Sequence, residues 1–332
     1  MNQSTPTSIS APIGFVQQSG FSEIGEKLIR QTIQRKLYFL IKTLRNQINK
    51  KIYLAKYSED AECFIKEIEK HGTTSIFLTI AYNTPWTIKL LINCWKKNCP
   101  DTALAVIDNS SNLKMADEIR KICISRNISY LKLPINTAGH MCRSHSLAIN
   151  WSWQNIICRI PALHTVGYID HDCIPIKHWS LSDKPDVFAY GAKNPGYLLG
   201  QKTWNLWAGF MIFDLSKSPI ARRKMDFTVN PLDTLDTGGM NWRLLYRYLE
   251  AKEYCFAKVR RIRLNYEGSD QNNSATIESE IIESSFLHLG GLTHKKTWKD
   301  VDIEKTIALF DGQNLPIDQE DNLYNAAWAV DS

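Results

Sequence analysis

The sequence predicts an α/β fold in which helices flank a mostly parallel sheet and a helical extension precedes that sheet. Between residues 71 and 175, short apolar runs rich in Val, Ile and Leu alternate with amphipathic stretches of helical length. Such alternation is typical of parallel strands joined by crossover helices. The composition agrees, because 332 residues with 44% hydrophobic and 22% charged residues suffice for one large globular domain with appendages.

Four strands and three helices are expected in this alternating region. The first strand is the apolar run from Ser75 to Ala81, and Pro85 soon after it favours the first turn of a helix. The elements that follow are a helix at 85–98, a strand at 103–108, a helix at 112–127, a strand at 129–134, a helix at 138–155 and a strand at 164–170. Beyond Pro175 the pattern is less regular, with strands expected at 187–193, 207–215 and 286–289 and a helix at 240–252.

Both ends of the chain differ in composition from this region. Residues 1–20 are rich in Ser, Thr, Gln and Pro, which predicts a disordered N-terminus. Residues 21–70 have a helical, charged pattern and are expected to form a basic amphipathic extension. Residues 293–332 are polar and acidic, and we expect a tail that wraps the surface.

A basic segment carries the whole excess charge of the chain. Residues 22–51 hold eight basic and two acidic residues, which accounts for the net charge of +6. The apolar residues of this segment recur at helical spacing at Leu37, Leu40, Ile41, Leu44 and Ile48. Such a helix either lies on anionic lipid or packs on the globular domain or a second subunit. Because the rest of the chain is neutral, no nucleic-acid partner is expected.

The chain is expected to be cytoplasmic, either free or held peripherally at the inner face of the membrane. No stretch reaches the roughly 18 apolar residues that a membrane span needs. The start of the chain, Met1 to Val16, lacks the basic and apolar regions of a signal peptide. The eight cysteines form no Cys-x-x-Cys pair, which favours reduced core thiols over disulfides or a zinc site.

The triplet Asp170-His171-Asp172 is the strongest candidate site, since it follows an apolar run that is typical of a buried strand. Ligands of open α/β sheets bind at the carboxyl ends of the strands, where the loops converge. Carboxylate oxygens suit Mg or Mn, which also bind water and substrate phosphates. A second triplet, Asp300-Val301-Asp302, has no strand before it and is interpreted as a solvated helix face.

Two earlier strands also end in polar residues. The first runs from Thr79 towards Asn83, and the second ends in Asp108 and Asn109. In a doubly wound sheet the loops after these strands face the same crevice as the loop after Asp170. An acid at the end of the second strand can accept from a base or ribose, although Asp108 could instead cap the following helix.

Four motifs together resemble the GT-A fold of nucleotide-sugar glycosyltransferases, especially the inverting family 2 type. They are Thr79 to Asn83, Val106 to Ser111, Asn136 to Gly139 and Tyr168 to Asp172. The resemblance covers residues 75–290 and rests on the order and spacing of the motifs. The sequence departs from the pattern at His171, where a small or acidic residue is frequent, and it lacks the common acidic pair near the acceptor site.

The resemblance implies a nucleotide-sugar-binding half at residues 71–200. It implies that a UDP or GDP sugar is contacted by Thr79, Asn83, Asp108, Asn109, Gly139 and Asp170. It also implies a divalent ion, Mn or Mg, held mainly by Asp172 together with Asp170 and His288. Taken alone, a strand histidine such as His288 is more often a packed core residue, and His294 is its weaker competitor.

An acceptor-binding half is expected at residues 201–292. Trp207, Gly209 and Phe210 combine aromatic rings with a glycine, and aromatic faces stack on sugars, although they also suit the core of a sheet. The resemblance places the base that accepts the acceptor proton at Asp236, with Asp233 in reserve. Either carboxylate could instead cap the helix that follows.

The expected function is metal-dependent transfer of a sugar, with inversion, to a hydroxyl of a glycan, a lipid-linked acceptor or a polysaccharide precursor. A metal offsets the charge that develops on the leaving phosphates, and one carboxylate takes the hydroxyl proton. The alternatives are a nucleotidyltransferase and a non-catalytic scaffold or membrane-attachment module. A nucleotidyltransferase would normally have a Gly-rich basic loop after the first strand, which Tyr82-Asn83-Thr84-Pro85 is not.

Overall fold

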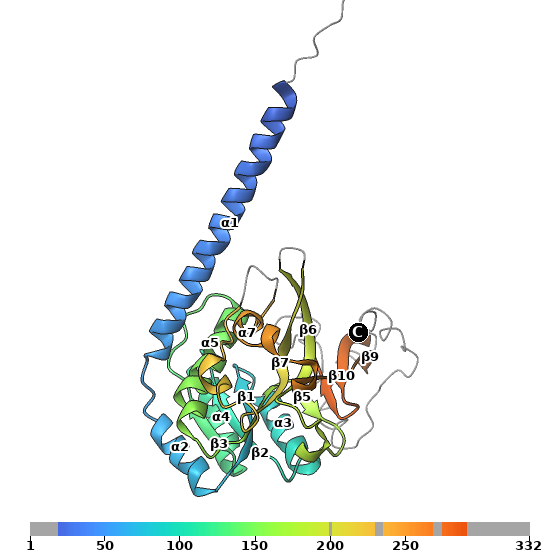
Figure 1. Cartoon of the computed structure of the whole chain (residues 1–332). Helices are drawn as coiled ribbons and strands as arrows, with labels where there is room; N and C mark the ends of the chain where they lie inside the picture. The colour runs from blue at the N-terminus through green and yellow to red at the C-terminus, as the bar shows by residue number, and fades with distance from the viewer. Residues whose placement is uncertain (1–18, 199–200, 230–234, 268–273, 291–332) are drawn as a thin grey trace, which may run out of the picture. The chain divides into compact units, whose positions relative to one another are not determined.

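The computed structural model describes residues 19–198, 201–229, 235–267 and 274–290 (Figure 1). The expected C-terminal tail and nearly all of the expected disordered N-terminus lie outside the described residues. The chain divides into two compact units, Met1–Leu44 and Arg45–Ser332. The second unit contains all the strands that are described below. No helix in the described ranges combines the length and the apolarity that a bilayer-spanning segment requires.

A mixed sheet of seven strands forms the centre of the second unit, in the order β3-β2-β1-β4-β7-β6-β8. Strands β1 to β4 pair in parallel, whereas β7 is antiparallel to both of its neighbours. The bounds are β1 Ser75–Ala81, β2 Ala103–Asp108, β3 Ser129–Lys132, β4 Thr165–Asp170, β6 Ala189–Leu198, β7 Gln201–Asp214 and β8 Tyr254–Ala257. The predicted α/β class with a mostly parallel sheet is confirmed.

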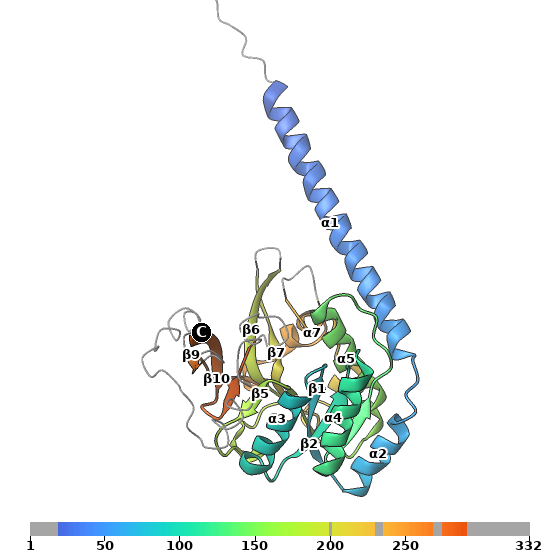
Figure 2. The same ribbon diagram turned by 180° about the vertical axis from the view of Figure 1, so that it is seen from behind.

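Helices cover both faces of this sheet, because successive side chains of a strand point to opposite faces. Leu78 on β1 belongs to one core, together with buried residues of α2 and α5. Its neighbour Phe77 belongs to the other core, together with α3 and α4, which lie next to each other (Figure 2). The helix bounds are α1 Ser19–Leu54, α2 Ala61–Lys70, α3 Pro85–Asn98, α4 Leu113–Ser125, α5 Met141–Asn155, α6 Ala221–Lys224 and α7 Met240–Leu244.

A smaller antiparallel sheet, in the order β5-β11-β10-β9, brings distant parts of the chain together. Its strands are β5 Cys173–Pro175, β9 Val259–Glu267, β10 Ser274–Ile282 and β11 Phe286–His288. Strand β11 pairs with β5 so that His288 lies opposite Cys173. The next residue, Leu289, donates its backbone N–H to the carbonyl oxygen of Asp172 at 2.9 Å. This pairing places β11 beside the loop that follows β4.

Most expected elements of the alternating region are present, whereas the second half of the chain was predicted less well. The strands 75–81 and 103–108 and the helix 85–98 have the expected bounds. The single helix expected at 240–252 is wrong, because α7 ends at Leu244 and short 3-10 turns follow. Leu245 and Tyr246 are buried there, so core packing overrides helix continuation. Strands β5, β8, β9 and β10 were not expected.

A buried ion pair fixes the C-terminal part of α1 to the loop after α6. Lys50 Nζ lies 2.6 Å from Asp226 Oδ2, and the two side chains are only 16% and 7% exposed. The carboxylate of Asp226 also accepts from the hydroxyl and the backbone N–H of Thr228. Burial alone would raise the pKa of Asp226, but Lys50 and the Thr228 hydrogen bonds hold it below its usual value.

Replacing Asp226 with Asn should lower the free energy of unfolding by about 3 kcal/mol at neutral pH, because the Lys50 ammonium stays buried without its counter-charge. Since folding lowers the pKa of Asp226, its stabilisation is complete above the ordinary aspartate pKa of about 4 and is lost as the pH falls through the folded value. Denaturant unfolding of wild type and variant at neutral and acidic pH measures both effects.

The exposed pair of Arg159 and Glu62 provides the control for this measurement. Its side chains are 44% and 47% exposed, so Glu62→Gln should change stability by less than about 1 kcal/mol. Equal losses for the Asp226 and Glu62 variants would contradict a specific role for the buried pair.

Candidate metal centre

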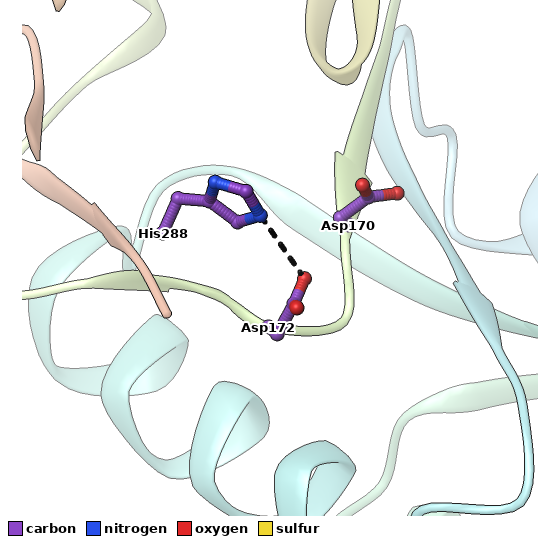
Figure 3. A group of neighbouring side chains, drawn as sticks. All are labelled: Asp170, Asp172 and His288. Carbon is purple, nitrogen blue, oxygen red and sulfur yellow. Dashed lines mark ion pairs between the residues drawn. The ribbon is translucent and has the colours of Figure 1, made fainter. Parts of the chain in front are cut away.

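Three ionisable side chains lie close together at the carboxyl end of β4, and Figure 3 shows His288 and Asp172 facing each other. Asp170 is the last residue of β4, Asp172 lies in the turn into β5, and His288 is the last residue of β11. One ligand atom from each of the three lies within 4.8 Å of the others. His288 Nε2 is 3.8 Å from Asp172 Oδ1, too far for a hydrogen bond. Two strand ends from different sheets therefore form one cluster.

The chemistry of this cluster fits a divalent cation. Two carboxylates and one imidazole are common ligands, and their spacing leaves a position between them for an ion. Burial raises the pKa of Asp170; His145 opposes that rise, and the adjacent charge of Asp172 adds to it. Two carboxylates held this close repel each other, and a bound cation would relieve that repulsion.

The imidazole of His288 is held on two further sides. Its Nδ1 atom lies 3.3 Å from Glu280 Oε2. The indole of Trp207 packs against it, with ring centroids 4.5 Å apart. Burial lowers the pKa of His288, but Asp172, Asp170 and Glu280 outweigh burial and raise it overall. The hydrogen bond with His288 in turn holds the pKa of Glu280 below its usual value.

Two neighbours of the cluster, Glu280 and His145, were missed from the sequence. His145 on α5 places Nε2 3.5 Å from Asp170 Oδ1. One feature of the sequence indicated His145, namely its position near the start of the helix that was predicted at 138–155. Glu280 gave no signal, because β10 was not predicted. The unusual middle residue His171 turns inward, with Nδ1 3.1 Å from the carbonyl oxygen of Ile80, and its Nε2 is buried without a partner among the described residues.

The carboxylate of Asp108 is engaged within the fold. It is fully buried, and it accepts from the N–H of Ser110 and from the hydroxyl of Tyr130, both at 2.7 Å. Lys132 Nζ lies 3.8 Å from the same carboxylate. The cap of α4 is instead Asn112, so the capping alternative for Asp108 is wrong. The side chain of Asp108 is fully buried, and its expected contact with a nucleotide stays a prediction.

Asn83 and Asn109 hold the loops at the ends of β1 and β2. Asn83 has a left-handed backbone with φ of 53°, and its amide donates to Ser111 and accepts from the N–H of Asn112. Asn109 donates to Ser144 Oγ at 3.0 Å and accepts from Asn136. Both residues lie in the loops that follow β1 and β2, and their contact with a nucleotide stays a prediction.

Two other expected contact residues lie in the core instead. Thr79 and Phe210 are fully buried, Thr79 within β1 and Phe210 against Trp179 and Phe286. Their expected roles in donor and acceptor binding stay predictions, and the observed role of both side chains is in packing. Gly139 is exposed, and a Cβ atom there would meet nothing within 4 Å, so the predicted close approach of a nucleotide to its backbone remains open.

The candidate base Asp236 lies beside the same helix that carries His145. Asp236 Oδ1 accepts from the N–H of Thr237 at 2.7 Å, and Thr237 donates to the carbonyl oxygen of Cys142 on α5. Burial and a hydrogen bond with Asp236 raise the pKa of Cys142 to about 12. The cap of α7 is Gly239, so Asp236 does not cap that helix. The reserve base Asp233 lies outside the described residues.

A cavity of about 740 Å³ lies apart from the cluster, on the surface of α6 and α7. None of the three cluster residues lines it. Its lining includes Lys224, Arg243, Arg247 and Tyr248. The size of this cavity therefore gives no support to the candidate metal centre.

No protein-family model and no curated protein sequence matches the chain. Similar solved structures include the apo structure of the bifunctional glycosyltransferase WbbM, at 12% identity, TM-score 0.37, 55% of this chain and 38% of that chain. Galactosyltransferase LgtC in complex with donor and acceptor sugar analogues is similar at 13% identity, TM-score 0.36, 55% of this chain and 73% of that chain. Mannosyltransferase PcManGT from Pyrobaculum calidifontis in complex with GDP-Man and Mn2+ is similar at 13% identity, TM-score 0.33, 62% of this chain and 60% of that chain.

This chain spans less than two thirds of the length of WbbM and of PcManGT. The proposed activity rests on the side chains of the cluster and its surroundings.

The glycine at position 209 makes room for Trp207. A Cβ atom on Gly209 would lie 2.1 Å from Trp207 Cζ2, well inside van der Waals contact. The indole cannot move freely away, because its other neighbours include the His288 ring. Gly209 is therefore needed to seat Trp207 against the cluster, which gives this residue a packing role whether or not it contacts an acceptor.

Replacing Gly209 with Ala should lower the free energy of unfolding by about 1–3 kcal/mol, because the added methyl group overpacks the Trp207 site. Gly139→Ala is the matched control, since a Cβ there meets nothing within 4 Å. That control should change stability by no more than about 0.5 kcal/mol. Chemical denaturation measures both variants, and an equally small effect at both positions would contradict the seating of Trp207.

Proposed function

We propose that the chain is a metal-dependent glycosyltransferase of GT-A type that moves a sugar from a nucleotide-diphosphate sugar to an acceptor hydroxyl. The observation that carries the proposal is the convergence of Asp170, Asp172 and His288 at the carboxyl end of β4. Strand ends in an α/β sheet are where nucleotide ligands bind, and this cluster is the described group suited to a divalent cation. An ion bound there would offset negative charge on the leaving diphosphate.

In this proposal the donor lies across the ends of β1, β2 and β4. Asn83 and Asn109 order the loops against which a UDP or GDP moiety packs. Asp172 and His288 hold the metal, and Asp170 completes the site or orients the ribose. Asp108 supports the loop from below, because its buried carboxylate is shared between Ser110 and Tyr130.

The acceptor side is proposed to lie between β7 and the start of α5. The half-buried indole of Trp207 offers an apolar face to a sugar, and Asp236 is exposed and able to take the proton of the attacking hydroxyl. Attack assisted by a carboxylate on the face opposite the leaving group gives inversion. Glycans, lipid-linked acceptors and polysaccharide precursors all supply such a hydroxyl.

Replacing Asp172 with Asn should lower metal-dependent sugar transfer by about 100-fold or more, because the cation loses a charged ligand. The measurement is release of UDP or GDP from a panel of nucleotide sugars with and without Mn2+. Asp117→Asn is the matched control, since that carboxylate is 58% exposed on α4. Full activity of the Asp172 variant would sink the metal role.

Calorimetry separates an enzyme from a non-catalytic scaffold. Wild-type protein should bind UDP or GDP more tightly in the presence of Mn2+ than in its absence, since the ion bridges phosphate and carboxylate. No binding of either nucleotide with Mn2+ present would favour a scaffold, and a normal thermal unfolding profile would show that the protein tested was folded.

We also propose that the N-terminal helix lies on an anionic membrane surface at the cytoplasmic face. In the first unit, five apolar side chains at helical spacing are each between 53% and 59% exposed: Ile33, Leu37, Leu40, Ile41 and Leu44. In the part of α1 that belongs to the second unit, Ile48 and Ile52 are exposed, whereas Asn46 and Tyr53 are buried. In this part of α1 the helix packs through Asn46 and Tyr53, and Ile48 and Ile52 stay exposed.

The charge of the helix favours lipid over a second copy of the chain. Residues 27–58 contain no acidic residue, and basic residues such as Lys36, Arg45 and Lys51 are exposed near the apolar ones. Two such helices would repel each other, whereas each basic residue near an anionic surface contributes about 1 kcal/mol of attraction. An amphipathic helix with this composition suits the interface of an anionic membrane.

Replacing Leu37, Ile41 and Leu44 together with Gln should weaken binding to anionic vesicles by at least about 10-fold, because the helix loses the apolar area that enters the interface. Co-sedimentation with phosphatidylglycerol and with phosphatidylcholine vesicles measures this. Substitution is preferable to deletion of residues 1–55, since deletion also removes Lys50 and its ion pair.

Gln34→Ala with Asn49→Ala is the control for this helix, because both residues are exposed and polar. Unchanged sedimentation of the triple variant would contradict membrane contact. A dimer of the wild type in ultracentrifugation that the triple variant loses would assign the apolar residues to a second copy instead.

A further inference from the structure

We propose that Glu280 is a positioning residue that fixes the ring of His288 for metal binding, an inference that rests on the proposed function. Glu280 and His288 are directly opposite each other in the antiparallel pair of β10 and β11. Their side chains meet on one face of the sheet, with Glu280 Oε2 3.3 Å from His288 Nδ1. Glu280 lies outside the group of three candidate ligands, so it acts through the histidine.

This contact determines which nitrogen of His288 is available to a cation. A neutral imidazole has one N–H and one lone pair, and an acceptor beside Nδ1 holds the proton on that atom. The lone pair is then on Nε2, the atom that lies 3.8 Å from Asp172 Oδ1. A carboxylate behind a metal-binding histidine fixes its tautomer and raises its basicity.

Glu280 is itself held in place from the opposite side. In the strand order β11-β10-β9, the residue opposite Glu280 on β9 is Arg261. Arg261 Nε lies 3.5 Å from Glu280 Oε1, so the two carboxylate oxygens have different partners. The row Arg261, Glu280 and His288 therefore runs across three adjacent strands and ends at the cluster.

Trp207 restricts the remaining freedom of the imidazole. Its ring centroid is 4.5 Å from that of His288, with an angle of 54° between the planes. Rotation of the histidine away from Asp172 is thus opposed by the indole as well as by Glu280. Packing limits where the ring lies, and the hydrogen bond selects the nitrogen that faces Asp172.

Glu280→Ala should weaken Mn2+ binding by about 10- to 100-fold in the presence of UDP or GDP. Glu280→Gln should recover part of this loss, because its amide oxygen still accepts from Nδ1–H without the negative charge. Glu278→Ala is the matched control, since Glu278 is exposed on the same strand and should leave affinity unchanged. Calorimetry measures affinity, and thermal unfolding confirms that each variant is folded.

The tautomer of His288 provides a readout that loss of packing alone would not move. Nitrogen NMR of histidine-labelled protein without metal, at alkaline pH, should show the His288 proton on Nδ1 in the wild type and in Glu280→Gln. In Glu280→Ala a mixture of the two tautomers is expected. An unchanged tautomer together with unchanged Mn2+ affinity in Glu280→Ala would overturn the proposal.

Different results would contradict the proposed function and the positioning role of Glu280. If wild-type protein binds no Mn2+ with either nucleotide, the proposed function fails. If the wild type binds Mn2+ and the Asp172 variant does not, but Glu280→Ala binds as the wild type does, only the positioning role is lost.

Discussion

The register between β5 and β11 is the constraint on which the candidate site depends. The pair aligns His288 with Cys173, directly after Asp172, and the N–H of Leu289 secures it by donating to the carbonyl oxygen of Asp172. A slip by one residue would turn the histidine to the other face of the small sheet. The larger sheet places two carboxylates at the end of β4, and the second sheet adds the imidazole of His288 beside them.

The electrostatics of the site follow from this arrangement. Burial raises the pKa of Asp170. Two histidines from different elements lie beside the carboxylates: His145 on α5 is near Asp170, and His288 on β11 is near Asp172. Two carboxylates thus lie close together, and among the described residues His145 and His288 lie beside them. Binding of a divalent cation would therefore stabilise this cluster, because the ion offsets the repulsion between the two carboxylates.

The local sequence pattern predicted the first half of the fold. The second half depends on pairing between distant strands, which the local pattern does not indicate. Apolar runs located β1, β2 and β4 because both faces of those strands are buried. Strand β5 has only three residues and was too short to predict. Charged residues interrupt the sequence of β10, so neither this strand nor Glu280 on it was predicted. Strand parity does not describe this part of β7: Trp207 and Phe210 pack on the same core, because the pairing with β6 is irregular between Gly191 and Lys193. The burial of Asp108 could not be predicted, because its partners Tyr130 and Lys132 come from a neighbouring strand.

Helix α5 connects the candidate metal centre with the candidate base. His145 reaches Asp170 from this helix, and Cys142, three residues earlier, contacts the Asp236 loop through Thr237. Residues three apart lie on the same side of a helix, about 5–6 Å from each other. The helix packs on the sheet through Leu147 and Trp151, so its position is fixed by the core. Asp170 and the loop that contains Asp236 thus both contact one helix, which relates the position of the candidate metal centre to that of the candidate base.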